Sequence, residues 1–278
     1  MTYGKLFWLG KQKLEKAGIG EADLDARLLL EFVCQTNRHD LLAHAEREVA
    51  DAQAQRYREL ITVRAGHVPL QHLTGVQEFM GLPFLVDGSV LIPRQDTEIL
   101  VEEAMKQLHD GFRILDMCTG SGCILLSLLH YSNDCLGVGA DISPAALAMA
   151  QKNAKALGEE RAEFVQSDLF AQIEGTFEII VSNPPYIPSA VIGSLMEEVR
   201  LHEPLSALDG GSDGLSFYRR ITAESRKYLC RGGYLFLEIG YDQKDAVAGM
   251  MEEACFADVT AVSDYAGLDR VVYGRYDH

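Results

Sequence analysis

The run with the most specific chemistry follows an apolar stretch, 177–181, and reads Ser182-Asn183-Pro184-Pro185-Tyr186. Proline fixes its own φ and disfavours the helical conformation for the residue before it, so Asn183 and Pro184 are held extended. Such a rigid backbone presents the side chains of Asn183 and Tyr186 in fixed positions. The alternative, a stiff loop without a further role, gives no packing reason for a polar asparagine at the end of an apolar strand.

A second candidate segment, 116–122, reads DMCTGSG and stands between a predicted strand and a predicted helix. Gly120 and Gly122 let the backbone approach a ligand closely, and the start of the helix offers unpaired N–H groups. A dinucleotide fingerprint would require a third glycine where Leu125 stands, which disfavours NAD. A Gly-x-Gly pattern alone also fits a tight strand-to-helix turn, so both interpretations stay open.

Two acidic residues follow two further predicted strands. Asp141 stands 25 residues after Asp116, where a carboxylate can accept hydrogen bonds from both hydroxyls of a ribose. Asp168 could accept from an adenine amino group while Leu169 or Phe170 covers the face of the base. Each acid alone could equally be a helix cap. Three successive strand ends with such features together favour a nucleoside-containing cofactor.

Strand and helix patterns alternate from residue 96 onward. We predict strands over 113–117, 135–141, 162–168, 177–183 and 233–240, and helices over 96–109, 122–130, 143–158 and near 215–229. Ser143 is the expected N-cap of its helix, with Pro144 in the first turn. The alternation predicts an α/β fold with a mostly parallel sheet covered on both faces and ligands at the carboxyl ends of its strands.

The first 75 residues have the pattern of a small helical bundle. Apolar residues recur at helical spacing over 24–33, and an arginine-rich helical pattern runs over 51–63. Prolines and glycines then interrupt the periodicity, and two apolar pieces, 79–86 and 89–92, could pair as a hairpin. We therefore predict a helical domain over 1–75, a β-hairpin linker over 76–95 and a further domain over 96–278.

Charge is unevenly distributed. The chain has 25 Lys and Arg against 41 Asp and Glu, a net charge of -16. Residues 1–75 hold 10 basic and 10 acidic side chains, so residues 76–278 hold 15 and 31 and carry the whole excess. Direct binding of duplex nucleic acid is disfavoured, because non-specific affinity for DNA comes from Lys and Arg.

Other patterns narrow the class of protein. A hydrophobic fraction of 47% with 24% charged residues is typical of globular domains. The apolar runs are far shorter than the roughly 20 residues of a membrane span, and the N-terminus lacks a signal-peptide pattern, so we expect a cytoplasmic protein without membrane contact. Six cysteines without a Cys-x-x-Cys pair indicate neither a zinc site nor disulfides; we expect them reduced and mostly buried, and we expect no metal.

The run from Asn183 to Tyr186 resembles the signature of class I methyltransferases that methylate a planar amide or exocyclic amine with S-adenosylmethionine. Two subfamilies share it: DNA adenine methyltransferases and protein glutamine-N5 methyltransferases acting on peptide chain release factors. Nearly the whole chain resembles the release-factor enzymes, in the motifs Pro69-Leu70-Gln71-His72-Leu73-Thr74-Gly75, Glu78-Phe79, Leu91-Ile92-Pro93-Arg94, Thr97-Glu98, Gly120-Ser121-Gly122-Cys123-Ile124, Glu203-Pro204, Ala207-Leu208, Gly211 to Leu215 and Glu238-Ile239-Gly240.

This resemblance implies a Rossmann-like class I methyltransferase domain with a mostly parallel seven-stranded sheet, preceded by a small helical domain that recognises the release factor. The implied activity is transfer of a methyl group from S-adenosylmethionine to the side-chain amide N5 of the glutamine in the Gly-Gly-Gln motif of release factors, by a monomer that supports translation termination. It implies catalytic roles for Asn183, Pro184 and Tyr186, with Pro185 added in the substrate site. The implied cofactor-binding residues are Asp116, Cys118, Thr119, Gly120, Ser121, Gly122, Asp141, Asp168, Leu169 and Asn183.

The implied mechanism rests on positioning. An amide nitrogen is a weak nucleophile because its lone pair is delocalised into the carbonyl group. If the Asn183 side-chain oxygen and the Pro184 carbonyl accept its two N–H bonds, the nitrogen is aimed at the sulfonium methyl and its developing positive charge is stabilised. Tyr186 would pack against the flat amide and offer its ring face to that charge.

The sequence departs from the family pattern at two places. Cys118 replaces the usual first glycine of the cofactor loop, so it must adopt a conformation that a Cβ accepts, or the loop shifts. Gln95-Asp96 replaces the usual Pro-Glu, and Asp96 suits a helix N-cap. Two other residues each have two possible roles. Trp8 either packs in the helical domain or contacts a partner, and Glu238 either faces the cofactor pocket or has a structural role.

Two functions from other classes compete with this interpretation. A nucleic-acid adenine-N6 methyltransferase would share the run from Asn183 to Tyr186 but should carry a basic region that binds its target. The acidity of residues 76–278 disfavours it. A non-catalytic cofactor-binding module would not need the full Asn-Pro-Pro-Tyr set.

Overall fold

The structure is a computed structural model that describes residues 1–277, and these form two units. Unit 1 consists of residues 1–75 together with 196–202, and unit 2 contains residues 76–195 and 203–277. Among the described residues, none of the helices has the length and apolar character that a membrane span requires.

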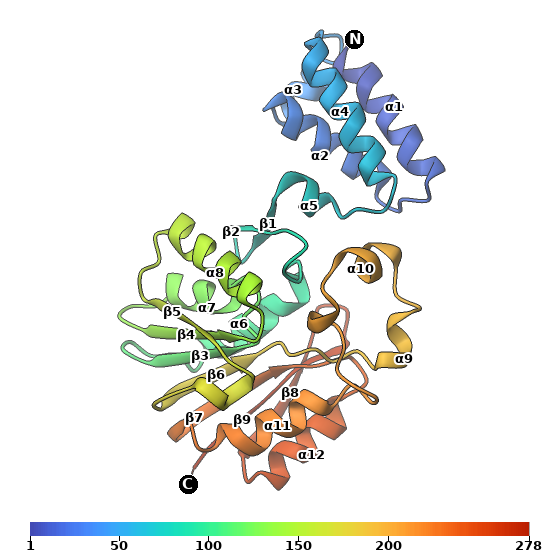
Figure 1. Ribbon diagram of the computed structural model, residues 1–278. Helices are drawn as coiled ribbons and strands as arrows, with labels where there is room; N and C mark the ends of the chain where they lie inside the picture. Colours follow the sequence, from blue (N-terminus) through green and yellow to red (C-terminus); the bar gives the residue numbers. More distant parts are fainter. Residues whose placement is uncertain (278) are drawn as a thin grey trace. The chain divides into compact units, whose positions relative to one another are not determined.

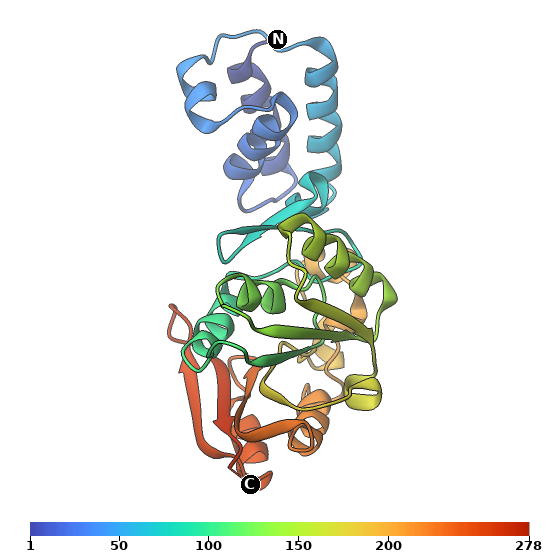
Figure 2. The ribbon, with the colours of Figure 1, turned by 90° about the vertical axis from the view of Figure 1, so that its left-hand side faces the viewer.

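Unit 1 is helical, as predicted. Its elements are α1 (Tyr3–Lys16), α2 (Ala22–Cys34), α3 (Arg38–Ala43), α4 (Asp51–Arg64), α5 (Leu70–Thr74) and α10 (Glu197–His202). Helices α1, α2 and α4 pack against one another around a leucine-rich core (Figures 1 and 2). The distant segment α10 is held in this unit by the buried Arg64, whose Nη2 lies 2.6 Å from Glu198 Oε1 while its Nε lies 2.7 Å from Asp25 Oδ2.

Trp8 does not pack in the core of unit 1. Helix α1 buries Tyr3, Leu6, Gly10 and Leu14, which recur at helical spacing and form one stripe. Trp8 falls on the opposite side of the helix, and 55% of its surface is exposed. The packing interpretation of this residue is therefore wrong.

Unit 2 begins with a hairpin of β1 (Val76–Phe79) and β2 (Leu82–Leu85), in which Phe79 pairs with Leu82. The predicted hairpin is thus confirmed, but its strands are 76–79 and 82–85 instead of the predicted pieces 79–86 and 89–92. The first of these pieces contains the turn, because Met80 (φ 51°) and Gly81 (φ 71°) both adopt the left-handed conformation that a tight hairpin turn needs. Methionine rarely adopts it, so Gly81 alone marked a break in the pattern, and the position of the turn was not predicted.

The sheet of unit 2 has seven strands in the order β5-β4-β3-β6-β7-β9-β8. They are β3 (Arg113–Met117), β4 (Leu136–Asp141), β5 (Ala162–Gln166), β6 (Phe177–Ser182), β7 (Leu229–Glu238), β8 (Ala257–Ser263) and β9 (Asp269–Arg275). The first five strands of that order are parallel, and β9 is antiparallel to both β7 and β8. The predicted α/β fold with a mostly parallel seven-stranded sheet is confirmed.

Helices cover both faces of this sheet (Figure 1). On one face lie α6 (Glu98–Met105), α7 (Cys123–His130) and α8 (Pro144–Leu157), and on the other lie α11 (Ser216–Ser225) and α12 (Lys244–Glu253). The short elements η1 (Gln95–Thr97), η2 (Leu169–Gln172), α9 (Ser189–Ile192) and η3 (Leu205–Ala207) lie in the connections. The order of strands reverses at β3, and such a reversal places ligands at the carboxyl ends of the strands beside it.

Local details confirm some of the sequence expectations and correct others. Ser143 caps α8, its Oγ accepting from the Ala146 N–H at 3.2 Å, and Pro144 occupies the first turn, as predicted. Asp96 does not cap α6, because η1 precedes the helix and the Asp96 carboxylate pairs with Arg270 at 3.2 Å. All six cysteines are free, but only Cys123 and Cys135 are buried, so the expectation of mostly buried cysteines is wrong.

Asn153 of α8 joins the hairpin to the loop after β3. It is fully buried; its Nδ2 donates to the carbonyls of Leu85 (3.1 Å) and Ser121 (2.9 Å), and its Oδ1 accepts from the Leu85 N–H (2.7 Å).

We expect Asn153→Ala to lower the free energy of unfolding by about 2 kcal/mol, because it removes the partners of three backbone groups. Urea unfolding measures this. The same truncation at the exposed Asn133 should change it by less than about 0.5 kcal/mol, and equal effects would contradict the argument.

Candidate functional site

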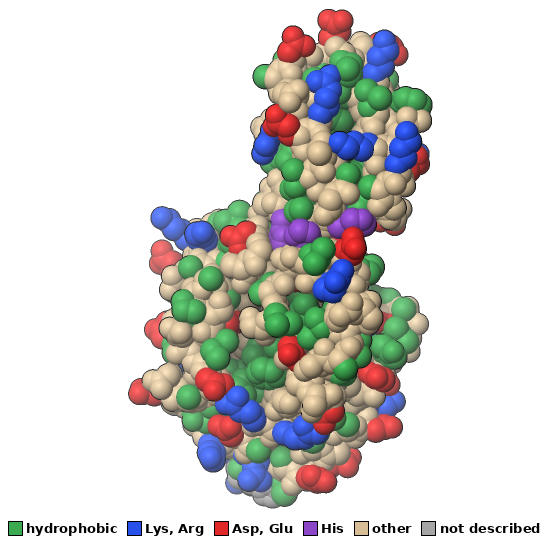
Figure 3. All heavy atoms as spheres, turned by 45° about the vertical axis from the view of Figure 1, so that its right-hand side comes forward, with side chains coloured by type: hydrophobic (Ala, Val, Ile, Leu, Met, Phe, Trp, Pro, Cys, Tyr) green, Lys and Arg blue, Asp and Glu red, His purple; other side chains and the backbone are tan. Residues whose placement is uncertain are grey.

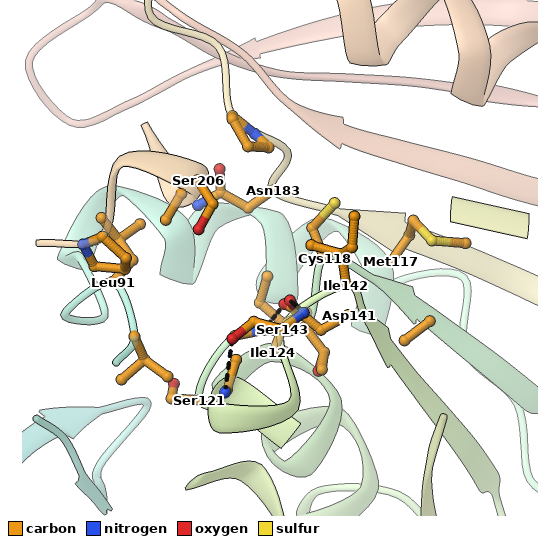
Figure 4. A pocket seen from close by; sticks show the side chains of 18 of the residues that line it. Leu91, Met117, Cys118, Ser121, Ile124, Asp141, Ile142, Ser143, Asn183 and Ser206 are labelled. Atoms are coloured by element: carbon orange, nitrogen blue, oxygen red, sulfur yellow. Dashed lines mark hydrogen bonds between the residues drawn. The ribbon is translucent and has the colours of Figure 1, made fainter. Parts of the chain in front are cut away.

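A cavity of about 370 Å³ lies at the carboxyl ends of β3, β4, β5 and β6. Its walls include the loop 117–121 after β3, the segment 141–143 after β4, Asp168 and Leu169 after β5, and Asn183 after β6. Hydrophobic side chains gather in a hollow of unit 2 (Figure 3), and the close view places Asn183 and Ser206 on one side of the cavity and Asp141 on another (Figure 4). Strand ends far apart in sequence therefore supply a single site.

The loop after β3 has a tightly wound backbone. Cys118 (φ 62°), Gly120 (φ 56°) and Gly122 (φ 80°) all adopt the left-handed conformation, which side chains with a Cβ rarely adopt. A Cβ at Gly122 would also be crowded, because it would lie 3.2 Å from the Ala150 Cβ on α8. Cys118 therefore carries a strained backbone conformation in the loop that leads to α7.

Asp116 supports this loop from behind and is not among the residues that line the cavity. It is fully buried, and its Oδ2 accepts from the Thr119 hydroxyl at 2.6 Å and the Leu125 N–H at 3.3 Å. Burial raises the pKa of Asp116 to about 7, although both hydrogen bonds oppose that shift. Gly122 likewise lies outside the lining.

Asp141 does line the cavity and is half-buried. Its Oδ2 accepts from the Gly120 N–H at 3.0 Å and its Oδ1 from the Ser143 N–H at 2.9 Å, so the carboxylate is oriented by two backbone groups. Each carboxylate oxygen has a further lone pair for a ligand. Burial raises the pKa of Asp141, and the backbone hydrogen bonds oppose it.

Asp168 and Leu169 lie on a further side of the cavity. The Asp168 carboxylate is exposed and pairs with Arg220 of α11, Nη1 to Oδ1, at 2.9 Å. Leu169 is buried with a left-handed backbone (φ 49°). The acid and the apolar residue expected to hold an adenine are thus brought to the same cavity as Asp141.

Asn183 and Pro185 line the cavity, whereas Pro184 and Tyr186 are not among its lining residues. The Asn183 Nδ2 donates to the Thr97 hydroxyl at 3.3 Å, which leaves the side-chain oxygen for another donor. Tyr186 is half-buried against the core, and its backbone carbonyl accepts from the Gln243 amide at 3.0 Å. Burial raises the pKa of the Tyr186 phenol, which therefore stays protonated.

Several lining residues were not among the predicted site residues. Arg94 and Thr97 belong to motifs that the resemblance includes, but neither was assigned a role; Arg94 pairs with the buried Glu203 at 2.5 Å. Ser206, Phe217 and Arg220 come from segment 187–230: Ser206 lies in η3, and Phe217 and Arg220 lie in α11, the helix predicted near 215–229. The resemblance includes three motifs of this segment, Glu203-Pro204, Ala207-Leu208 and Gly211 to Leu215, but it assigned none of them a role in the site.

The comparisons with solved structures define the class of fold. A methyltransferase from Pyrococcus furiosus matches with a TM-score of 0.56 and 16% identity, over 72% of this chain and 91% of that one. A 16S rRNA methyltransferase from T. thermophilus in complex with AdoMet and guanosine matches with a TM-score of 0.52 and 18% identity, over 72% of this chain and 49% of that one. Residues 94–199 also match the family profile of the methyltransferase small domain. Unit 2 thus has a Rossmann-like methyltransferase fold.

Sequence comparisons identify the family. Residues 5–75 match the profile of the PrmC N-terminal domain. Release factor glutamine methyltransferase from Geobacter sulfurreducens is 41% identical over 263 residues, covering 94% of this chain and 92% of the relative. The protein of that name from Moorella thermoacetica is 44% identical over 275 residues, covering 97% of each. The chain belongs to the release factor glutamine methyltransferase family and is a methyltransferase.

The strain at Cys118 can be measured. A left-handed backbone costs roughly 1–2 kcal/mol for a residue with a Cβ, and more when that Cβ is branched. We expect Cys118→Val to have a free energy of unfolding about 2 kcal/mol lower than Cys118→Gly, by urea unfolding. Equal stabilities of the two variants would show that the loop relaxes out of the left-handed conformation.

The raised pKa of Asp116 predicts a pH dependence of stability. A carboxyl group whose folded pKa of about 7 exceeds the unfolded value of 3.8 stabilises the fold fully below the unfolded pKa. That contribution is lost as the pH rises through about 7. We expect Asp116→Asn to reduce this loss by on the order of 1 kcal/mol or more between pH values of about 5 and 8. Unfolding at both pH values, with the exposed Asp110→Asn as control, tests it; an unchanged slope in Asp116→Asn would contradict it.

Proposed function

We propose that this protein transfers a methyl group from S-adenosylmethionine to the side-chain amide N5 of the glutamine in the Gly-Gly-Gln motif of peptide chain release factors. Family membership supports the reaction class, because relatives covering nearly the whole chain are named release factor glutamine methyltransferases. The observation that carries the proposal is the position of Asn183, with an unused side-chain oxygen, in the same cavity as the loop after β3.

The residues of the cavity fit S-adenosylmethionine. Its volume of about 370 Å³ lies within the range of about 300–1,000 Å³ for small-molecule sites. We assign Asp141 to the ribose hydroxyls, Asp168 and Leu169 to the adenine, and the loop residues Cys118, Thr119, Gly120 and Ser121, with Asn183, to the remainder. Asp116 and Gly122 act indirectly, by holding the loop. When bound, the cofactor supplies an electrophilic methyl group on a sulfonium centre.

The protein's contribution to catalysis is to orient the substrate amide. Asn183 Oδ1 and the Pro184 carbonyl accept its two N–H bonds, so its nitrogen faces the methyl group. These two oxygens also stabilise the positive charge that develops on the nitrogen as the N–C bond forms and the S–C bond of the sulfonium breaks. Pro184 and Pro185 fix the backbone that carries both acceptors. We assign to Tyr186 the packing against the amide plane that the resemblance implies, although its side chain is not part of the cavity lining. One amide proton passes from the nitrogen to solvent after transfer.

We assign the recognition of the release factor to residues 1–75 and the role of linker to residues 76–95. The family profile that matches residues 5–75 supports a dedicated first domain. On the face of the molecule drawn in Figure 3, acidic and basic side chains are interspersed, which does not offer a continuous basic surface for a phosphate backbone. That face and the net charge of -16 both disfavour duplex DNA as the substrate.

The assay of this function measures methyl transfer from labelled S-adenosylmethionine to purified release factor. Its controls are a release factor with the glutamine of Gly-Gly-Gln changed to alanine, and duplex DNA. We expect label only in the unmutated release factor. Label in DNA would contradict the substrate assignment, and label in both release factors would contradict the target residue.

Asn183→Ala tests the mechanism. Removing one acceptor from the developing charge should lower kcat by roughly 10²–10³-fold. The dissociation constant for S-adenosylmethionine should change by less than about threefold, because most of the assigned cofactor contacts remain. Asn133→Ala, the same truncation at an exposed site, should keep full activity. Near-normal turnover by Asn183→Ala would exclude this role.

A further inference from the structure

Glu238 is a buried carboxyl group to which the proposed mechanism gives no role. It ends β7, next to β6 in the sheet, and only 2% of its surface is exposed. Its Oε2 accepts no hydrogen bond from any described residue. Ser182 pairs with Leu237, so Glu238 stands level with Asn183 on the neighbouring strand. The Thr97 hydroxyl and the Asn183 amide both lower the pKa of its carboxyl group, as nearby hydrogen-bond donors do. The side chain thus lies behind Asn183 without lining the cavity.

The three side chains can form a chain of hydrogen bonds with a fixed direction. Asn183 Nδ2 donates to the Thr97 Oγ1 at 3.3 Å, and the single hydroxyl proton of Thr97 is then free to point to Glu238. An ionised carboxylate only accepts hydrogen bonds. If the Asn183 amide were rotated by half a turn, its oxygen would take the Thr97 proton and Glu238 would lose a donor while buried.

We propose that Glu238 and Thr97 are positioning residues that keep the Asn183 amide in one orientation, with Oδ1 turned toward the substrate. This inference rests on the proposed function, in which Oδ1 accepts the glutamine N–H. The nitrogen and oxygen ends of an asparagine amide have nearly the same shape, so packing alone selects weakly between them. An acceptor-only group at the end of the chain selects by hydrogen bonding.

The charge state of Glu238 provides a test. Burial raises the pKa of Glu238 to about 7, whereas the Thr97 and Asn183 hydrogen bonds and Arg270 lower it. When protonated, Glu238 can donate to Thr97, and the preference for one amide orientation weakens. The titratable and charged groups that face it from neighbouring elements are Asp96, Cys123, Tyr186, Tyr218 and Arg270.

The first experiment observes the Asn183 amide directly and needs no turnover. The chain contains four asparagines, Asn37, Asn133, Asn153 and Asn183, so selective ¹⁵N-asparagine labelling gives four side-chain NH₂ signals. The loss of one signal in Asn183→Ala assigns it. We expect that signal to shift with a midpoint near pH 7 in the wild-type protein and to stop shifting in Glu238→Gln. Asn153, bonded to Leu85 and Ser121, is the internal control. A signal that does not titrate, or still titrates in Glu238→Gln, would overturn the proposal.

The second experiment measures kinetics. Thr97→Val should lower kcat roughly tenfold with little change in KM for the cofactor, and Thr97→Ser should restore it to within about twofold because it keeps the hydroxyl. In the wild-type protein, kcat should rise as the pH increases through about 7, because ionised Glu238 selects one orientation of the Asn183 amide. Glu238→Gln should remove this rise, whereas Asp110→Asn, at an exposed carboxyl group, should keep it. Glu103→Gln, at a buried glutamate of α6, should behave as wild type. Equal activity of Thr97→Val and Thr97→Ser would contradict the proposal even if Glu238→Gln fails to fold.

The two proposals fail in different ways. If wild-type protein does not methylate release factor, the proposed function is wrong, while the titration of the Asn183 signal still decides whether Glu238 controls the amide. If wild-type protein is active and the Asn183 signal is independent of Glu238, only the positioning role is wrong.

Discussion

The pairing of β3 with β6 in parallel register is the constraint on which the site depends. Met117 pairs with Ser182 at the last position of the two strands, and the Ser182 hydroxyl donates to the Met117 carbonyl at 2.6 Å. The next residues are Cys118 and Asn183, so the register brings the first residue of the loop after β3 and the polar residue before the two prolines to one level. A slip by one residue would turn every side chain of β6 to the opposite face of the sheet.

Around this pair of strands, the cavity contains features that lower the stability of the fold, namely a strained backbone and buried carboxyl groups. Cys118 is held in a left-handed conformation, and burial raises the pKa of Asp116, Asp141 and Glu238. Each of these carboxyl groups has backbone N–H or hydroxyl groups nearby that oppose the shift. The covering helices and the buried strand cores supply the compensating stability, because the central strands are apolar along almost their whole length.

The sequence predicted the features that short-range physics controls. The strand ends, the Ser143 cap and the glycines of the loop after β3 have local patterns with physical causes, and the structure has strands and helices there. Features set by distant partners could not be predicted. Met80 enters a left-handed turn, Asp96 pairs with Arg270 from β9, and α10 joins unit 1 through Arg64. The cavity residue Ser206 lies in the short element η3, and its position likewise depends on what it packs against. Arg220 lies in the predicted helix α11, but the helical pattern did not indicate that it would pair with Asp168 at the cavity.

A rigid backbone fixes the position of an asparagine but not the orientation of its side-chain amide. Pro184 and Pro185 fix where the Asn183 backbone lies, but they do not select which end of its amide faces the cavity. That choice has almost no steric component, so it must come from hydrogen bonding to groups of fixed polarity. The Thr97 hydroxyl can either donate or accept a hydrogen bond, so Thr97 alone does not select the orientation of the Asn183 amide. A buried carboxylate only accepts hydrogen bonds, so it can select the orientation of the amide. This is a physical reason for a glutamate at position 238, where an apolar residue would stabilise the fold more.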